Sequence, residues 1–194
     1  VDNSWSIKNL HRLIMMSDAY QRSSHYPLMD YLKQKDPDNK LLAYFQPRRL
    51  RSEELRDSML FVSGELNTEM GGLPVFPEIN MEVAMQPRHV MGSIAPAYQP
   101  SPTPEQRNRR TIYVYRYRGL SDPMLEVFNQ PSADISCERR TSSTVTPQVF
   151  TLFNSQNSYR RALAMAQRLV KERSQLSEQI QCGVQLAWCR NAET

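Results

Sequence analysis

The spacing of hydrophobic residues along the chain predicts a series of amphipathic helices. The clearest stripe is Leu55, Met59, Val62 and Leu66, which recur at helical intervals after a Ser-Glu-Glu start at residues 52–54. Another stripe begins at Ile7, with Ser6 as N-cap and Trp5 and Leu10 at the spacing of a hydrophobic staple. Further helices are predicted over residues 28–33, 40–45 and 120–129, from Thr146-Pro147 onward, after Asn154-Ser155, and over about 175–188.

Residues 71–111 interrupt the helical pattern because they contain seven of the 13 prolines. Proline fixes φ and removes a backbone donor, so this stretch is predicted to be an irregular excursion with room for a short strand. The predicted fold class is therefore mainly α, an irregular multi-helix domain with one short strand region and a long Pro-rich loop. Residues 1–194 are predicted to form a single helical domain.

The predicted core and the predicted strand both follow from these patterns. Thr111 to Tyr117 alternates in the manner of a strand, with its tyrosines on one face and its aliphatic residues on the other. Five to seven helices are expected to pack around a common core. Its predicted members are Trp5, Leu10, Ile14, Leu55, Met59, Val62, Leu163 and Leu169.

Composition and charge exclude several classes of protein. The chain has 24 Lys and Arg against 20 Asp and Glu, a net charge of +4, so obligatory nucleic-acid binding is not expected. No apolar run approaches the roughly 18 residues of a membrane helix, and no span is predicted. The three cysteines form no C-x-x-C or C-x-x-C-H motif and are read as buried free thiols. The three histidines have no ligand spacing, so no metal site is predicted.

A candidate polar cluster combines arginines and carboxylates from two parts of the sequence. The first four are assigned to one helix, and the last two are expected to meet it from a distant segment. Its members are Arg49, Glu53, Arg56, Asp57, Arg139 and Arg140. One interpretation is an ion-pair network that fixes helices in register. The other is an anion or carboxylate site built from arginine forks.

The predicted strand is also a candidate binding surface, because its tyrosines alternate with arginines. The residues are Tyr113, Tyr115, Tyr117, Arg116 and Arg118, and Arg107, Arg109 and Arg110 precede them. This pattern suits stacking on sugar rings or a peptide and occurs in single-stranded nucleic-acid binders. It also suits a strand whose tyrosines pack on helices while its arginines snorkel or pair.

Several carboxylates could supply an acid/base pair of the glycosidase kind. They are Glu53, Asp57, Asp122, Glu126 and Asp134. That mechanism needs two carboxyl groups roughly 5–9.5 Å apart in a cleft. Solvated or ion-paired carboxylates are the alternative.

Several fixed strings occur in one order along almost the whole chain. They are W-S-I-K-N-L-H-R-L-I at 5–14, D-P-D-N-K-L-L at 36–42, R-R-L at 48–50 with Glu53, Arg56, Asp57 and S-G at 63–64, Arg110 with I-Y at 112–113 and Arg118, and finally Phe128, Cys137, R-R at 139–140, S-T-V at 143–145 and P-Q at 147–148. In combination they resemble the planctomycete PSD-type domain, a domain of unknown function common in large predicted secreted proteins.

The resemblance implies an extracytoplasmic domain, periplasmic or at the cell surface, and assigns no catalytic residue. It implies a non-catalytic structural or interaction domain of a larger protein, with partners among the other domains of the same chain, a polysaccharide or a surface protein. No cofactor is expected in this chain, and haem c would belong to a cytochrome-c-like domain upstream. The alternative is a carbohydrate-active hydrolase or redox-assisted enzyme that uses the candidate polar cluster.

The chain also departs from the family pattern at a few positions. Asn129 follows Phe128 where an Asp is expected, and Cys189 stands before Arg190 where a Gly is usual. The runs expected before Trp5 and after the last residue are absent. We therefore expect a truncated copy of the domain that lacks part of its first helix and its C-terminal end.

Overall fold

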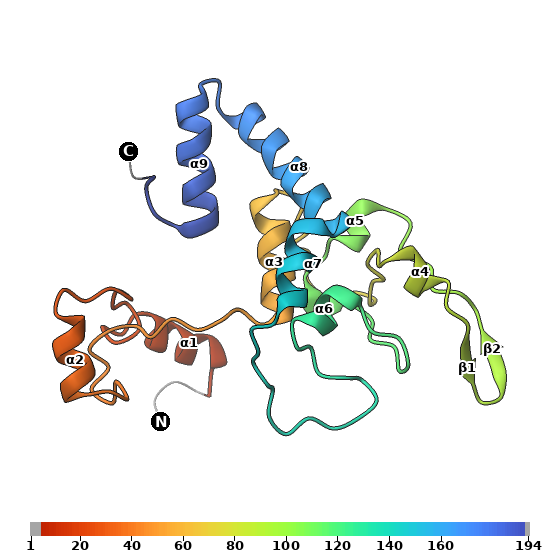
Figure 1. Ribbon diagram of the computed structural model, residues 1–194, viewed down its shortest axis with the longest axis horizontal. Coiled ribbons are helices and arrows are strands. Elements are labelled where there is room, and N and C mark those ends of the chain that lie inside the picture. The colour runs from red at the N-terminus through yellow and green to blue at the C-terminus, as the bar shows by residue number, and fades with distance from the viewer. Residues whose placement is uncertain (1–4, 193–194) are drawn as a thin grey trace. The chain divides into compact units, whose positions relative to one another are not determined.

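The computed structural model describes residues 5–192 and divides into two compact units, residues 1–49 and residues 50–194. Each unit is described separately below. The fold class is confirmed as mainly α, since the described residues form nine α-helices and a single two-stranded sheet (Figure 1). The assignment of residues 1–194 to one domain stays a prediction.

The first unit holds two short helices, α1 (Ile7–Met15) and α2 (Met29–Lys35). Ser6 is confirmed as the N-cap of α1, because its hydroxyl accepts a hydrogen bond from the backbone N–H of Asn9 at 3.4 Å. Trp5 is 89% exposed, so the predicted staple gives this side chain little burial. The apolar stripe of α1 is likewise exposed, and the prediction of Leu10 and Ile14 as core residues is wrong.

The helix predicted over residues 40–45 is replaced by a turn. The two carboxylate oxygens of Asp36 accept hydrogen bonds from the backbone N–H groups of Lys40 and Leu41, at 2.9 and 2.8 Å. Asn39 is buried and has a φ of 49°, which no helical residue adopts. Short polar side chains that bond nearby backbone in this way compete with helix formation.

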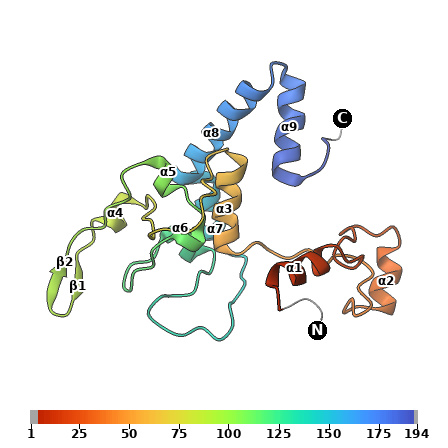
Figure 2. The ribbon, with the colours of Figure 1, turned by 180° about the vertical axis from the view of Figure 1, so that it is seen from behind.

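The second unit is built around one central helix, α3 (Ser52–Val62). The helix α8 (Gln156–Glu172) and the short helix α6 (Pro123–Val127) pack against it (Figures 1 and 2), and so does the 3-10 turn η1 (Thr111–Tyr113). The other elements follow in chain order: α4 (Met81–Ala84), β1 (Arg88–Val90), β2 (Ser93–Ala95), α5 (Pro104–Arg107), η1 (Thr111–Tyr113), α6 (Pro123–Val127), α7 (Thr146–Asn154), α8 (Gln156–Glu172) and α9 (Leu176–Trp188).

The buried face of α3 differs from the predicted stripe. Ser52, Arg56 and Leu60 are buried, each four residues after the last, and this seam faces the rest of the unit. Leu55 and Met59 stand beside the seam and are half-buried. The helical period was therefore correct, but the most buried line along α3 includes a serine and an arginine rather than the largest apolar residues.

The buried apolar residues of the described chain are not those predicted for the core. The buried ones are Leu60, Val75, Ala84, Tyr98, Met124, Leu125 and Phe128. Three of them lie in the Pro-rich excursion, and three lie in or next to α6. Leu163 on α8, predicted for the core, is exposed instead, and the buried residue of this helix is Ser158.

The excursion over residues 71–111 is irregular, as predicted. It contains two four-residue helices, α4 and α5, and a hairpin in which β1 and β2 pair antiparallel with His89 opposite Ile94. Both ribbon views show this hairpin extending away from the helices of the second unit (Figure 2). Met91 at its tip is fully exposed.

The strand predicted over residues 111–117 is wrong. The segment begins with the 3-10 turn η1, and its extended part forms only isolated bridges, between Val75 and Val114 and between Tyr117 and Leu120. The backbone N–H and carbonyl of Val75 bond to the flanking residues Tyr113 and Tyr115, each at 2.9 Å. The alternation of tyrosines and aliphatic residues is present in the sequence. However, side chains of α3 bind Thr111 at the start of the segment, and the turn η1 forms there in place of a strand.

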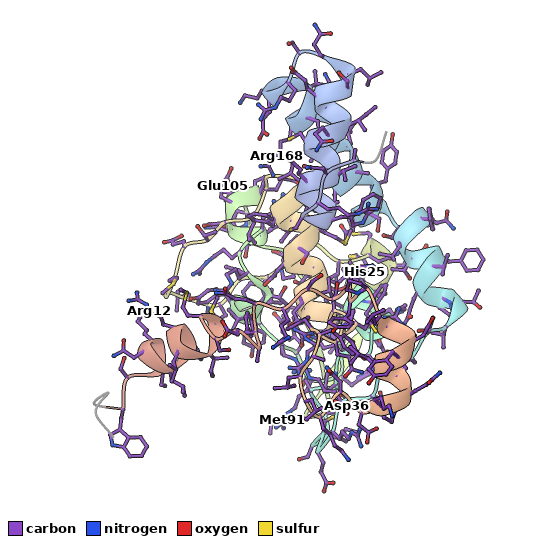
Figure 3. The ribbon with its side chains drawn as sticks, turned by 90° about the vertical axis from the view of Figure 1, so that its left-hand side faces the viewer. Arg12, His25, Asp36, Met91, Glu105 and Arg168 are labelled. Carbon is purple, nitrogen blue, oxygen red and sulfur yellow. The ribbon has the colours of Figure 1, made fainter. Side chains whose placement is uncertain are left out.

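The C-terminal helices match their predicted starts. Pro147 lies in the first turn of α7, and Ser155 caps α8 by accepting from the backbone N–H of Ser158 at 3.1 Å. Arg168 on α8 donates to the last carbonyls of α3, those of Phe61 and Val62, at 3.0 Å each (Figure 3). No helix in the described part of the chain is long and apolar enough to cross a membrane.

All three cysteines are free, as predicted, but they are not buried. Cys137 and Cys189 are exposed, and Cys182 is half-buried. Cys189 follows the end of α9 and adopts the left-handed conformation that glycine usually takes at this position. The family departure at residue 189 therefore places a side chain where a glycine is the unstrained choice.

We expect Leu60→Ala to lower the free energy of unfolding by about 2–5 kcal/mol, because Leu60 is buried to 2% exposure at the centre of α3. Phe61→Ala is the matched control, since Phe61 is the next residue and is exposed. Urea denaturation followed by circular dichroism measures both. Equal losses for the two variants would show that the buried face of α3 is wrongly assigned.

Candidate functional site

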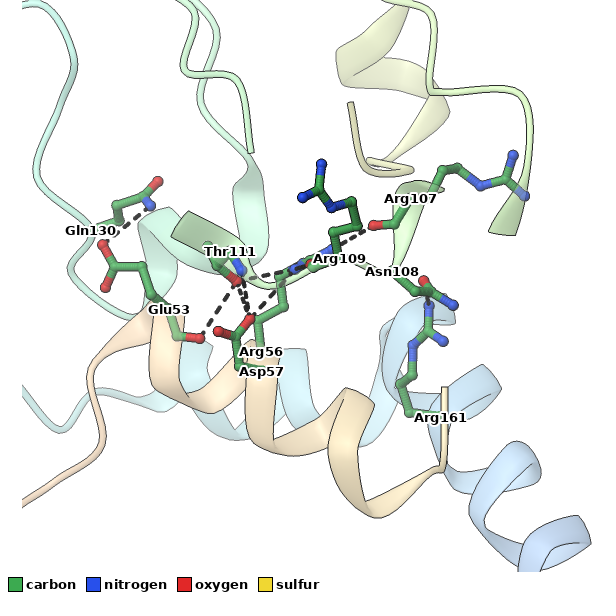
Figure 4. A network of polar contacts seen from close by, with 9 residues as sticks. All are labelled: Glu53, Arg56, Asp57, Arg107, Asn108, Arg109, Thr111, Gln130 and Arg161. Carbon is green, nitrogen blue, oxygen red and sulfur yellow. Dashed lines mark hydrogen bonds and ion pairs between the residues drawn. The ribbon is translucent and has the colours of Figure 1, made fainter. Parts of the chain in front are cut away.

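A buried guanidinium ties α3 to the end of the Pro-rich excursion (Figure 4). Arg56 donates to the backbone carbonyls of Arg107 and Arg109 at 2.8 and 3.0 Å, and to the hydroxyl of Thr111 at 3.0 Å. Burial lowers the pKa of Arg56, and the nearby carboxylates of Asp122 and Asp57 oppose this shift. The side chain keeps its charge because these acceptors replace the water it has lost.

Asp57, one turn after Glu53 on α3, completes this junction. Its Oδ1 accepts hydrogen bonds from the backbone N–H and the hydroxyl of Thr111, at 2.7 and 2.6 Å. The same oxygen lies 3.7 Å from a guanidinium nitrogen of Arg56. Asp57 therefore holds the start of η1 against α3, and its carboxylate is engaged within the fold.

Glu53 is bound by residues far away in the sequence. Its Oε2 pairs with Arg140 at 2.7 Å and accepts from the Ser52 hydroxyl at 3.1 Å, and its Oε1 accepts from Gln130 at 3.4 Å. Burial alone would raise the pKa of Glu53. The hydrogen bonds from Arg140, its own backbone, Ser52 and Gln130 together outweigh burial and lower the pKa to about 2.

Asp122 is the carboxylate with the opposite behaviour. It caps α6 by accepting from the backbone N–H of Met124 at 2.9 Å. Burial raises the pKa of Asp122, and neither this hydrogen bond nor the charge of Arg56 fully compensates. The site therefore contains two carboxyl groups, Glu53 and Asp122, whose surroundings shift their pKa values in opposite directions.

Glu53, Asp57 and Asp122 line an open groove of about 410 Å³, called here the α3 groove. One wall is the first part of α3, another is the segment from residue 110 to 122, and the third is the loop at 130–140. The polar members are Arg51, Glu53, Glu54, Asp57, Arg110, Thr111, Arg116, Ser121, Asp122, Gln130 and Arg140, and the others are Ile112, Val114, Tyr115, Tyr117, Leu120, Leu125 and Ala133.

The two candidate sets predicted separately from the sequence meet in this groove. Glu53, Asp57 and Arg140 come from the polar cluster, while Tyr115, Arg116 and Tyr117 come from the predicted binding strand. Arg56 lies outside the groove lining and instead lines a second cavity of about 190 Å³. Asp122 lines both cavities.

Other predicted members lie elsewhere. Arg49 precedes α3 and belongs to the first unit, so its assignment to the same helix as Glu53 is wrong. Arg139 is exposed and does not line the groove. Arg118 is also exposed and outside the groove lining. Of the five candidate acid/base carboxylates, Glu126 and Asp134 lie outside it as well.

Tyr113 is separated from the other two tyrosines and has a structural role. The guanidinium of Arg109 stacks on its ring at 4.2 Å, and its hydroxyl accepts from the backbone N–H of Gly71 at 3.0 Å. Arg109 itself is buried and donates to the carbonyls of Glu69, Gly71 and Leu73. Arg107 and Arg109, which precede Arg110, therefore both stabilise the fold.

The remaining tyrosines form part of an aromatic cluster beside the groove. The rings of Tyr115 and Tyr117 lie 4.7 Å apart, and Phe76 contacts them at 5.4 and 5.9 Å. Tyr117 also meets Tyr98 edge to face at 5.7 Å. Tyr115 is the most open of these rings at 46% exposed, so it is the aromatic surface available to a ligand.

Sequence reasoning missed the parts of the site that depend on tertiary contact. Thr111 and Gln130 have ordinary neighbours in sequence, and no local signal marks them as partners of Asp57 and Glu53. Asp122 was named only as one of several carboxylates. The described residues contain no group of three or more His, Cys, Asp or Glu that could hold a metal ion.

The fold and the groove define a mainly helical domain with an arginine- and carboxylate-lined surface. Over residues 1–194 the chain matches the family described as PSD1, protein of unknown function (DUF1553), and it belongs to that family. The resemblance inferred from the sequence motifs is therefore confirmed. Comparisons with curated proteins and with solved structures gave no match.

We expect Arg56→Ala to lower the free energy of unfolding by roughly 3–5 kcal/mol, because it leaves buried carbonyls and Asp57 without their partner. The melting temperature should fall by several degrees. Arg118→Ala is the control, since this exposed arginine has no contact in the site. A melting temperature for Arg56→Ala equal to that of the control would contradict the assigned network.

The Glu53 pKa makes stability depend on pH in a defined direction. A pKa lowered from 4.5 to about 2 stabilises the folded state above about pH 4.5, and this contribution is lost as the pH falls toward 2. We therefore expect the stability difference between the native chain and Glu53→Gln to shrink over that window. Denaturant titrations from pH 2 to 7 measure it, and a constant difference would show that Glu53 is not held by Arg140.

Proposed function

We propose that this chain is a non-catalytic interaction domain of a larger extracytoplasmic protein and that the α3 groove binds a polysaccharide. The observation that carries the proposal is the engagement of the groove carboxylates. Glu53 is paired with Arg140, and Asp57 accepts two hydrogen bonds from Thr111. Groups held in this way shape a binding surface, whereas a general acid or base must exchange its proton during each turnover.

The form of the groove supports binding to a sugar chain. Its volume of about 410 Å³ falls within the range of roughly 300–1,000 Å³ typical of ligand sites. The half-exposed ring of Tyr115 offers a flat apolar face beside several charged side chains. Sugar rings present both C–H faces and hydroxyl groups, so this combination suits them.

The cellular setting is part of the same proposal and rests on the resemblance alone. We infer that the parent protein is exported and carries a cytochrome-c-like domain with haem c upstream of this one. The other domains of that protein, or a surface protein, would then be additional partners. Reading the parent gene upstream tests this directly: a signal peptide and a C-x-x-C-H motif support it, and the lack of both contradicts it.

A carbohydrate-active hydrolase is the second candidate, and one observation favours it. Asp122, with a raised pKa, and Glu53, with a lowered pKa, line the same groove. Pairs of carboxyl groups with opposed pKa shifts are typical of general acid and base or nucleophile assignments. This candidate requires that a polysaccharide be cleaved, and that Asp122→Asn remove the cleavage.

We expect the native chain to bind at least one polysaccharide in a panel of soluble pectins and dextrans, and Tyr115→Ala to weaken that binding about tenfold through loss of ring contact. Affinity gel electrophoresis measures it. Tyr159→Ala is the matched control, because Tyr159 is an exposed tyrosine on α8 outside the groove.

Thermal melting of both variants verifies that the fold is retained, and Tyr115→Leu replaces Tyr115→Ala if it is not. Release of new reducing ends from the same polymers is assayed in parallel. Binding without cleavage supports the interaction domain. Cleavage that disappears in Asp122→Asn supports the hydrolase, and equal weakening by the Tyr159 control would show that the groove is not the binding surface.

A further inference from the structure

We propose that the polysaccharide bound by the α3 groove is anionic and that Arg51, Arg110 and Arg116 bind its carboxylate or sulfate groups. This inference rests on the proposed function and adds the chemical class of the ligand. All three arginines line the groove and are exposed. They come from two sides of it, since Arg51 precedes α3 while Arg110 and Arg116 lie in the wall formed by residues 110–122.

The side chains of Arg51 and Arg110 differ in their contacts from the arginines of α8. Within residues 5–192, neither guanidinium has a hydrogen bond or ion pair in the structure. On α8, by contrast, the arginines are paired with carboxylates of the same unit. These pairs are Arg160 with Glu78, Arg161 with Glu65 and Arg168 with Glu172. The groove thus presents guanidinium groups that the fold leaves open to a ligand.

Arg116 is only partly engaged. One of its terminal nitrogens donates to the carbonyl of Pro131 at the groove wall. A guanidinium has five N–H donors, so this single bond orients the fork and leaves donors for an anion. Planar forks of this kind bind carboxylate and sulfate oxygens in pairs of parallel hydrogen bonds.

Two of the four carboxylates that line the groove are engaged by arginines of the fold and therefore do not compete for these open guanidinium groups. Glu53 pairs with Arg140, and Asp57 lies beside the buried Arg56. Burial raises the pKa of Asp122, and Glu54 accepts a hydrogen bond from the backbone N–H of Arg51 at 2.8 Å. Four arginines and four carboxylates line the groove, and among these arginines Arg51 and Arg110 have a guanidinium without a bond to another described residue, so these two groups are open to an arriving anion.

The same carboxylates argue for a sugar chain over a nucleic acid. A single DNA strand carries a phosphate on every nucleotide and no free hydroxyl group along its backbone, so its backbone offers no hydrogen-bond donor to the carboxylates that line the groove. An acidic glycan separates its charges with hydroxyl groups, which donate hydrogen bonds to carboxylates. The alternation of arginines, carboxylates and the Tyr115 ring matches that pattern.

The test compares polymers that differ only in charge. Isothermal titration calorimetry at about 0.15 M salt measures the native chain with pectate and fully methyl-esterified pectin, and with dextran sulfate and dextran. We expect at least one charged polymer to bind about tenfold or more tightly than its neutral counterpart, and the pair that shows the effect identifies carboxylate or sulfate as the recognised group.

Variants then locate the interaction. Arg51→Gln and Arg110→Gln should each weaken the charged polymer about tenfold, because each removes a charge-assisted hydrogen-bond donor. Arg118→Gln makes the same change of net charge next to Tyr117 but outside the groove, and it should have little effect on the affinity for the charged polymer. All three positions are exposed, so melting temperatures should match that of the native chain.

The outcomes separate this inference from the proposed function. If the neutral polymers bind as well as the charged ones, the anionic ligand is overturned, but the proposal that the groove binds a polysaccharide is not. If Arg118→Gln weakens binding as much as Arg110→Gln, the role of the groove arginines is overturned. No binding to any of the four polymers overturns both the inference and the proposed function. An oligo-dT that binds tighter than the charged polymers at the same salt overturns the inference in favour of a nucleic acid.

Discussion

The second unit depends on one buried guanidinium, that of Arg56. A backbone hydrogen bond from Asn67 to the carbonyl of Asn108 joins the end of the Pro-rich excursion to the residues after α3, and side chains fix its return to the helix itself. Arg56 supplies this by binding the carbonyls of Arg107 and Arg109, which places Thr111 within reach of Asp57. Because Tyr115 and Tyr117 follow directly, the position of the groove wall is set by the same contact. A charge buried at the centre of α3 thus replaces the apolar contact that a regular helix pair would use.

Arginine has a second structural role in the excursion. Arg109 gathers three carbonyls of the turn after α3 and stacks on Tyr113, so it orders a loop that contains two glycines with positive φ. The basic run that looked uniform in the sequence therefore divides by function. Arg107 and Arg109 bond the backbone of the excursion, whereas Arg110, Arg116 and Arg118 are exposed. Among the arginines of this run, exposure rather than charge therefore determines which side chains can contact a ligand.

The sequence predicted what depends on local pattern and missed what depends on long-range bonds. Caps at Ser6 and Ser155 and the proline at residue 147 located helix starts, because capping needs only neighbouring residues. The failed strand at 111–117 had the correct alternation, but Asp57 binds the N–H of Thr111 from 54 positions away. The predicted core failed for a related reason, since Val75, Ala84 and Tyr98 lie in a stretch with no period to reveal them. For the site, the sequence identified Glu53, Asp57, Arg140 and the later tyrosines as candidates. It did not predict that they line the same groove.

The pairing pattern inside the groove is the main argument about what the domain does. Glu53 and Arg140 are 87 positions apart, yet they meet and neutralise each other, which holds the 130–140 loop against α3. That contact forms one wall of the groove and removes Glu53 from acid–base chemistry near neutral pH, since its pKa is about 2. The open donors are then the arginines at the edges, and the open apolar face is Tyr115. Because Glu53 and Asp57 are engaged within the fold while Arg51, Arg110 and the Tyr115 ring face solvent, we propose that this surface binds a ligand rather than transforming it.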